Sequence, residues 1–84
     1  MTFIKGKLVL LILMKRIGEK LRTLRHQREL TIRQLGNVFD VDKSLISKIE
    51  TGKSLPSLGL AVRLAEFFEV SLDDLVDDDA EIAE

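Results

Sequence analysis

Residues 17–76 are divided into short segments by capping and turn residues, and this division constrains the fold more than any other feature of the sequence. Thr31, Asp42, Ser57 and Ser71 each stand directly before a segment, where a side-chain oxygen can accept a hydrogen bond from the free N–H groups at a helix start. Within the segments, apolar residues recur at intervals of three and four, which places them on one helix face. The pattern predicts an all-α fold of five short helices.

The boundaries of the expected helices follow from these signals. We expect helices from Ile17 to near Glu29, Ile32 to Phe39, Lys43 to about Thr51, Leu58 to Glu69, and from the Ser71 cap through Val76. Gly52 is expected to end the third helix, because glycine readily adopts the left-handed conformation found after helix ends. The predicted inward positions include Leu35, Val38 and Phe39 in the second helix, Ile46 and Ile49 in the third, and Leu58, Ala61, Leu64, Ala65 and Phe68 in the fourth.

Length and composition limit the possible functions. A chain of 84 residues forms one small domain, so a two-domain enzyme with an active-site cleft is excluded. The sequence has no cysteine and one histidine, His26, and it offers no convergent set of nucleophile, base or metal ligands. We therefore expect no enzymatic activity, no metal, no cofactor and no small-molecule substrate. The lack of cysteine fits a reducing compartment, so we expect a cytoplasmic protein.

The net charge of −1 hides two oppositely charged parts. Residues 1–53 carry 12 basic and 5 acidic side chains, whereas residues 54–84 carry one basic side chain, Arg63, and 9 acidic ones. A basic half favours the phosphates of a nucleic acid as partner, because the position of charge matters more than its sum. Residues 77–84 are expected to form a solvated acidic tail, since a calcium loop would need glycine at its sixth position.

An uninterrupted apolar run, Leu8–Met14, precedes the helical segments. Its seven residues are too few to cross a bilayer, which takes about 20, so we expect no contact with a membrane interior. A signal peptide is disfavoured because Lys15 and Arg16 stand where small residues are needed for cleavage. We expect residues 1–16 to form an extension that contacts a second copy of the chain. A buried strand or helical turn, and a native start at Met14, are the alternatives.

The unit Thr31–Gly52 has the form of a helix-turn-helix: two short helices joined by a tight turn. A helix that enters the major groove of DNA must be held from behind by apolar packing and be polar towards the bases. Ile46 and Ile49 supply the packing side. The opposite side carries Lys43, Ser44, Ser47 and Lys48 in the first part of the helix, the end from which such helices reach base edges.

Four stretches carry a resemblance to a known family: IGEKLRTLR (17–25), LTIRQLG (30–36), VDKSLISKIETGK (41–53) and PSLGLAVRLAEFFEVSLDDL (56–75). In these motifs the chain resembles the Cro/C1-type, or XRE-type, helix-turn-helix family. The resemblance covers 17–76 and implies a five-helix, lambda-repressor-like bundle. It also implies a homodimer that binds a two-fold symmetric operator in double-stranded DNA and regulates transcription.

Residue roles follow from the resemblance by position. The base-reading residues would be Lys43, Ser44, Ser47 and Lys48, the phosphate-contacting residues Thr31, Arg33, Lys53 and Ser54, and a structural ion pair would join Arg25 and Glu50. Four residues depart from the family pattern: Ile32 and Leu45 replace polar residues, and Asp40 and Glu69 replace glycines. These departures leave the operator sequence open.

Two further interpretations stay open at this point. Leu60, Phe67 and Val76 form either a self-complementary dimer contact or additional core packing. An antitoxin-type module, which would bind a partner protein and also bind DNA at its own gene, is the alternative to a free-standing regulator. The apolar run and the acidic tail would then be the surfaces for that partner.

Overall fold

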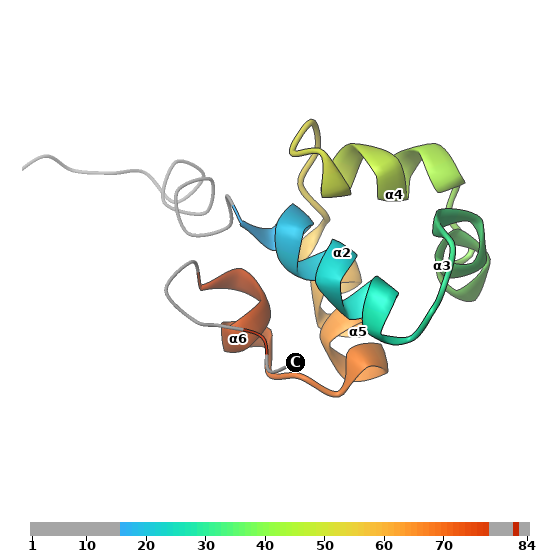
Figure 1. The fold of residues 1–84 in the computed structure, drawn as a ribbon. Coiled ribbons are helices and arrows are strands. Elements are labelled where there is room, and N and C mark those ends of the chain that lie inside the picture. Colours follow the sequence, from blue (N-terminus) through green and yellow to red (C-terminus); the bar gives the residue numbers. More distant parts are fainter. Residues whose placement is uncertain (1–15, 78–81, 83–84) are drawn as a thin grey trace, which may run out of the picture.

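The computed structural model describes residues 16–77 and residue 82, and within them the chain is helical and has no strand (Figure 1). The helices are α2 (Ile17–Gln27), α3 (Ile32–Phe39), α4 (Lys43–Glu50), α5 (Leu58–Phe68) and α6 (Leu72–Val76). The all-α prediction is therefore confirmed. In Figure 1, α4 lies across one end of the molecule, α2 crosses the front and α5 runs behind it.

The helix starts lie at the predicted capping residues, because a side-chain oxygen at each of them accepts a backbone N–H. Thr31 and Gln34 form a reciprocal capping box, in which Thr31 Oγ1 accepts from Gln34 N at 3.0 Å and Gln34 Oε1 accepts from Thr31 N at 2.8 Å. The other caps are Asp42 Oδ1 to Ser44 N at 2.7 Å, Ser57 Oγ to Leu60 N at 3.1 Å and Ser71 Oγ to Asp74 N at 3.0 Å.

Helices α3 and α6 end at the predicted Phe39 and Val76, and the other three helix ends differ by one or two residues from the prediction. Glu29, Asp40 and Glu69 have φ values of 55°, 55° and 58°, in the left-handed region, so none of them continues a helix. For this reason α2 ends at Gln27 rather than near Glu29, and α5 ends at Phe68 rather than Glu69. The end of α4 at Glu50 precedes Gly52, whose φ of 80° fits its predicted place after a helix.

The core is aliphatic at its centre and receives residues from all five helices. Its fully buried large side chains are Ile17, Leu21, Leu35, Ile46, Ile49, Leu64 and Leu75. Two predicted inward positions are wrong: Val38 is 48% exposed and Leu58 is 70% exposed. Val38 lies one position before Phe39, off the face that Phe39 shares with Leu35. Leu58 shares a face with the buried Ala61 and Ala65, but it is the first residue of α5 and is left uncovered at the helix start.

Lys20 has a structural role that the sequence did not indicate. Its side chain lies in α2 and the residue is 3% exposed. Its ammonium group donates to the carbonyl oxygen of Asp74 at 2.7 Å and also to that of Asp77. Carbonyl oxygens at a helix C-terminus lack partners within the helix, so Lys20 caps α6 and ties it to α2.

Some sequence-based expectations fall on residues that the structure does not describe. These are the apolar run Leu8–Met14, the native start at Met14, and most of the acidic tail. No helix within 16–77 has the length and apolar character needed to cross a membrane. Within the same range no group of three or more histidine or acidic side chains is placed to hold a metal ion.

Candidate nucleic-acid interface

The turn between α3 and α4 packs against Gly36 in the last turn of α3. A Cβ atom on Gly36 would lie 2.8 Å from the carbonyl oxygen of Val41, so no larger residue fits there without a shift of the backbone. Val41 N donates to Gly36 O at 2.9 Å, and Asp40 between them adopts the left-handed conformation. The tight connection places the start of α4 against the side of α3.

The opposite end of α4 is seated on α2. Ile46 and Ile49 are fully buried, as the sequence predicted. Gly18 of α2 lies so close to the end of α4 that a Cβ atom would overlap the carbonyl oxygens of Ile49 and Glu50. Backbone contact of this kind requires glycine, and the sequence-based reading assigned Gly18 no role.

Arg25 and Glu50 form an ion pair between α2 and α4, at the position that the resemblance implied. Arg25 Nε donates to Glu50 Oε2 at 2.7 Å, and a terminal guanidinium nitrogen donates to Glu50 Oε1 at 2.9 Å. The side chain of Glu50 is 1% exposed and that of Arg25 is 10% exposed. The hydrogen bonds to Glu50 raise the pKa of Arg25 above its ordinary value, so this cation stays charged.

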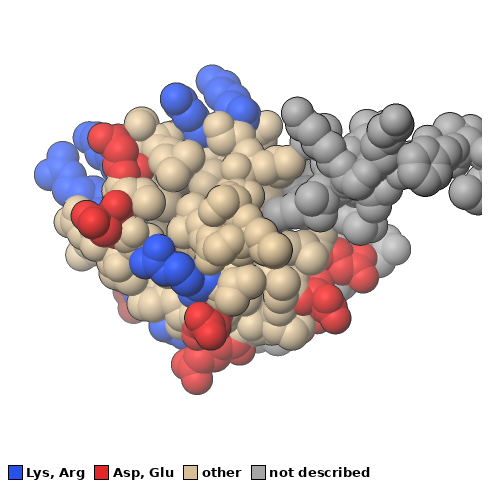
Figure 2. Space-filling model, turned by 180° about the vertical axis from the view of Figure 1, so that it is seen from behind, with Lys and Arg blue, Asp and Glu red and all other residues tan. Residues whose placement is uncertain are grey.

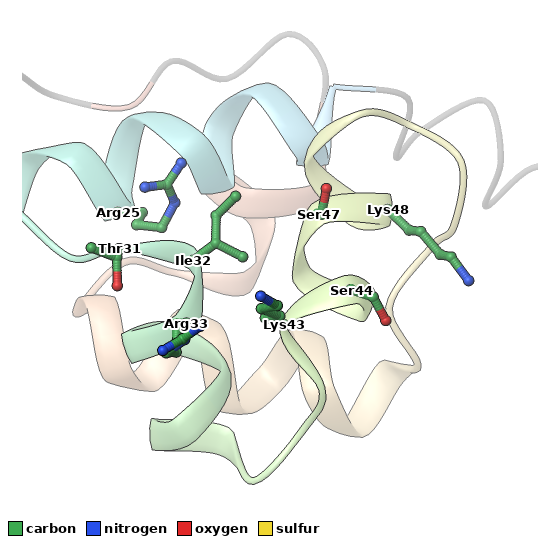
Figure 3. Close-up of a pocket in the computed structure, with 8 residues that line it drawn as sticks. All are labelled: Arg25, Thr31, Ile32, Arg33, Lys43, Ser44, Ser47 and Lys48. Atoms are coloured by element: carbon green, nitrogen blue, oxygen red, sulfur yellow. The ribbon is translucent and has the colours of Figure 1, made fainter.

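Between α3 and α4 lies an open groove with a volume of about 780 Å³ (Figure 3). It is lined by Arg25, Thr31, Ile32, Arg33, Lys43, Ser44, Ser47 and Lys48. Six of these eight are residues predicted to contact DNA, and they come from two different helices. In Figure 3, Ile32 lies between Thr31 on one side and Ser47 on the other.

The groove is basic. Four of its eight lining residues are cations and none is acidic. Lys43, Lys48 and Arg33 are exposed, so their charges are available to a bound anion. The nearby carboxylate of Asp42 accepts hydrogen bonds from the backbone N–H and hydroxyl of Ser44, and these bonds lower its pKa. Asp42 therefore caps the start of α4 and does not line the groove.

Two predicted phosphate-contacting residues lie beside the groove rather than in its lining. Lys53 and Ser54 follow α4, and the backbone N–H groups of both donate to Lys48 O, at 2.8 Å and 3.2 Å. The side chain of Lys53 is exposed and that of Ser54 is half-buried. Ile32 and Arg25, by contrast, line the groove although the sequence gave neither of them a contact with DNA.

The three residues considered for a dimer contact pack against the domain's own core. Leu60 is 8% exposed and belongs to the buried cluster, so it presents almost no surface to another chain. Phe67 and Val76 are partly buried against the same cluster. Phe67 makes an edge-to-face contact with Phe39, with ring centroids 5.4 Å apart.

The described part of the chain matches a known protein family. Residues 16–78 match the helix-turn-helix domain family. The chain belongs to the XRE-like helix-turn-helix family of DNA-binding proteins. This match covers the five described helices and includes the groove.

Relatives of this helix-turn-helix protein are transcriptional regulators. It is 38% identical over 64 residues to the HTH-type transcriptional repressor RghR of Bacillus subtilis (strain 168), covering 75% of this chain and 47% of the relative. It is 37% identical over 59 residues to the HTH-type transcriptional activator BcrR of Enterococcus faecalis, covering 70% of this chain and 29% of the relative. The chain thus spans less than half the length of either protein.

A solved structure has the same fold. The crystal structure of an HTH_3 family transcriptional regulator from Vibrio cholerae superposes with a TM-score of 0.63 at 26% sequence identity. The match covers 74% of this helix-turn-helix chain and 35% of the other chain.

Proposed function

We propose that this helix-turn-helix chain regulates transcription in the cytoplasm by binding a two-fold symmetric operator as a homodimer. The α4 helix of each copy enters the major groove, and the two half-sites lie about one helical turn, or roughly 34 Å, apart. The proposal is carried by one observation: six predicted DNA-contacting residues from α3 and α4 line a single basic groove. The groove lies beside α4, the helix that the family resemblance assigns to base reading.

Base reading is assigned to α4. Lys43 and Lys48 carry donors suited to the O6 and N7 atoms of guanine, and Ser44 and Ser47 can donate or accept. The buried Ile46 and Ile49 on the opposite side support this assignment, because they hold the helix against the domain.

Phosphate contacts are assigned to the flanks of α4. Thr31 and Arg33 stand at the start of α3, and Lys53 and Ser54 stand in the loop after α4. The two pairs bracket the helix, so they can hold both sides of the groove that it enters. Contacts of this kind position the protein without reading sequence.

Ile32 gives the groove wall an apolar side chain where the family commonly has a polar one. The thymine methyl group is the apolar feature that a protein meets in the major groove. We assign Ile32 a contact with such a methyl group. Replacing thymine by uracil in the operator removes the methyl and keeps the base pair, so it should weaken binding by the wild type and leave binding by Ile32→Ala unchanged.

Selection from a pool of random duplexes tests the main proposal. Wild type should enrich a two-fold symmetric sequence, and the combined Lys43→Ala and Lys48→Ala substitutions should reduce its preference for that sequence over random duplex. Arg33→Ala should instead weaken binding to all duplexes and lower the slope of log affinity against log salt by about one per protomer. Arg28→Gln is the control, because it also removes one positive charge but at a residue that does not line the groove. The guanidinium of Arg28 lies 5.1 Å from the centroid of the Phe67 ring. Failure of wild type to enrich any sequence would overturn the proposal.

A further inference from the structure

The buried carboxylate of Glu50 lies between two arginines of α2. Arg25 donates to it through Nε at 2.7 Å and through a terminal nitrogen at 2.9 Å, and Arg22 Nε lies 3.4 Å from Glu50 Oε1. Gly18 packs against the same end of α4, and it shares a face of α2 with Arg22 and Arg25, four and seven positions later. Two cations thus share one anion, which leaves one positive charge in excess.

The excess charge is available at Arg22 and not at Arg25. All three side-chain nitrogens of Arg25 donate within the domain, two to Glu50 and the third to Leu30 O at 2.9 Å. The side chain of Arg22 is 50% exposed, compared with 10% for Arg25. In the described part of the chain, Nε is the nitrogen of Arg22 that has an acceptor. Its two terminal nitrogens can therefore donate to a molecule outside the domain.

Arg22 lies where the face of α4 that lines the groove reaches α2. Lys43, Ser47 and Glu50 are four and three positions apart, so they share this face of α4. Lys43 and Ser47 line the groove, and Glu50 continues their row to α2, where it meets Arg22 and Arg25. Because Arg25 also lines the groove, Arg22 lies beside its α2 end.

The end of the molecule that carries α4 is also a basic end. In Figure 1, α4 lies along the upper edge. Figure 2 shows the molecule from behind, with basic atoms projecting from the same upper edge and acidic atoms at the lower edge. An anionic duplex is attracted to the basic end, and Arg22 is held there by the last residue of α4.

We propose that Arg22 binds a phosphate of the duplex through its terminal nitrogens while Glu50 holds its Nε. The inference rests on the proposed function, and it adds a contact from α2 to those assigned to α3 and to the loop after α4. The planar guanidinium matches the oxygens of a phosphate. Since Nε is already held, the side chain loses less freedom when it binds. Glu50 is therefore a positioning residue as well as the partner of Arg25.

The salt dependence of binding to a duplex with one half-site tests the contact. One phosphate contact contributes about 0.9 to the slope of log affinity against log salt, so Arg22→Gln should lower the slope by about that amount. The ratio of wild-type to variant affinity should then shrink about 3.5-fold between about 50 and 200 mM salt. Arg28→Gln is the matched control and should keep the slope, because Arg28 also lies 3.4 Å from a glutamate, Glu69, but away from the groove lining.

Neutral methylphosphonates, placed one at a time in the half-site duplex, supply a second measurement. One position that weakens binding by the wild type should lose its effect in Arg22→Gln and keep it in Arg28→Gln. Arg22→Lys retains the charge, but its single ammonium group is a poor replacement for a fork that holds Glu50 and a phosphate together. This variant should restore the slope and only part of the affinity.

The outcomes separate this inference from the proposed function. An unchanged slope in Arg22→Gln, or the same set of sensitive phosphates in that variant and the wild type, would overturn the contact. Full affinity in Arg22→Lys would overturn the positioning by Glu50. If the wild type bound the half-site no better than random duplex, the proposed function would fail, while the slopes of the variants on random duplex would still test Arg22. A wild type that bound no duplex would overturn both.

Discussion

The ion pair between Arg25 and Glu50 gives the sharpest prediction about stability. Glu50→Gln keeps the size of the side chain but removes the negative charge, so Arg25 is left as a cation that is 10% exposed and lacks its counterion. The amide oxygen can replace one of the two acceptors, at 2.7 Å and 2.9 Å, and the amide NH₂ cannot replace the other. Arg25 still donates to Leu30 O at 2.9 Å, so its guanidinium group keeps one hydrogen-bond acceptor outside Glu50.

The expected cost in the free energy of unfolding is about 3 kcal/mol. A lost hydrogen bond to a charged group costs about 1.5–3 kcal/mol, and breaking a buried ion pair from one side costs about 3–5 kcal/mol. A domain of this size loses about 4–8 °C of Tm per kcal/mol, so the melting temperature should fall by about 12–24 °C. Urea denaturation followed by helical circular dichroism measures the same change.

Two variants make this prediction refutable. Glu19→Gln is the matched control, because its partner Arg16 lies 3.4 Å away and Glu19 is 69% exposed, so its loss should be about 0.5 kcal/mol or less. The double variant Arg25→Met with Glu50→Met should be destabilised by less than the two single variants together, since it leaves neither charge unpaired. A loss in Glu50→Gln no larger than that in Glu19→Gln would refute the reasoning.

Three other predictions concern local structure. Lys20→Met should speed amide hydrogen exchange in α6 more than in α4, because it removes the donor to the C-terminal carbonyls of α6; an equal increase of the exchange rate in both helices would contradict this. In urea denaturation, Gly36→Ala should lower the free energy of unfolding by about 1–3 kcal/mol, because its methyl group overlaps Val41 O, whereas Gly59→Ala should raise it by about 0.5–1 kcal/mol. A change of the same sign in both variants would contradict this prediction. The pKa of Asp42 is lowered in the folded chain, so the stability that its carboxylate contributes is complete above the ordinary pKa and is lost as the pH falls through the lowered one. The difference in urea midpoint between wild type and Asp42→Ala should therefore shrink on acidification, and a constant difference would exclude this role.

The parts of the fold that could be predicted from sequence are those set by neighbouring residues. Thr31 and Asp42 accept hydrogen bonds from N–H groups two or three positions away, so a short stretch of sequence was enough to place the starts of α3 and α4. The exposure of Val38 and Leu58 could not be read in this way. Helical spacing gives a face, but the position of the neighbouring helices decides how much of that face is covered.

Contacts between distant segments likewise could not be predicted from the spacing of residues in the sequence. Lys20 and its acceptor Asp74 are 54 positions apart, and nothing in either local sequence marks a lysine that caps a remote helix. Arg25 was assigned correctly to Glu50 through the family resemblance. Its place in the wall of the groove beside Ile32 depends on how α2, α3 and α4 meet, which no local pattern expresses.

In α4 the residues that hold the helix in place are separate from the exposed ones, and this separation determines which substitutions the sequence can accept. Ile46, Ile49 and Glu50 hold the helix in place, and the exposed Lys43, Ser44 and Lys48 take no part in the buried core. Substitutions at the exposed positions can therefore accumulate at little cost to folding. Under the proposed function, a lineage of such chains can move from one operator to another while its scaffold stays the same, and a designer can retarget this domain by rewriting the same few positions.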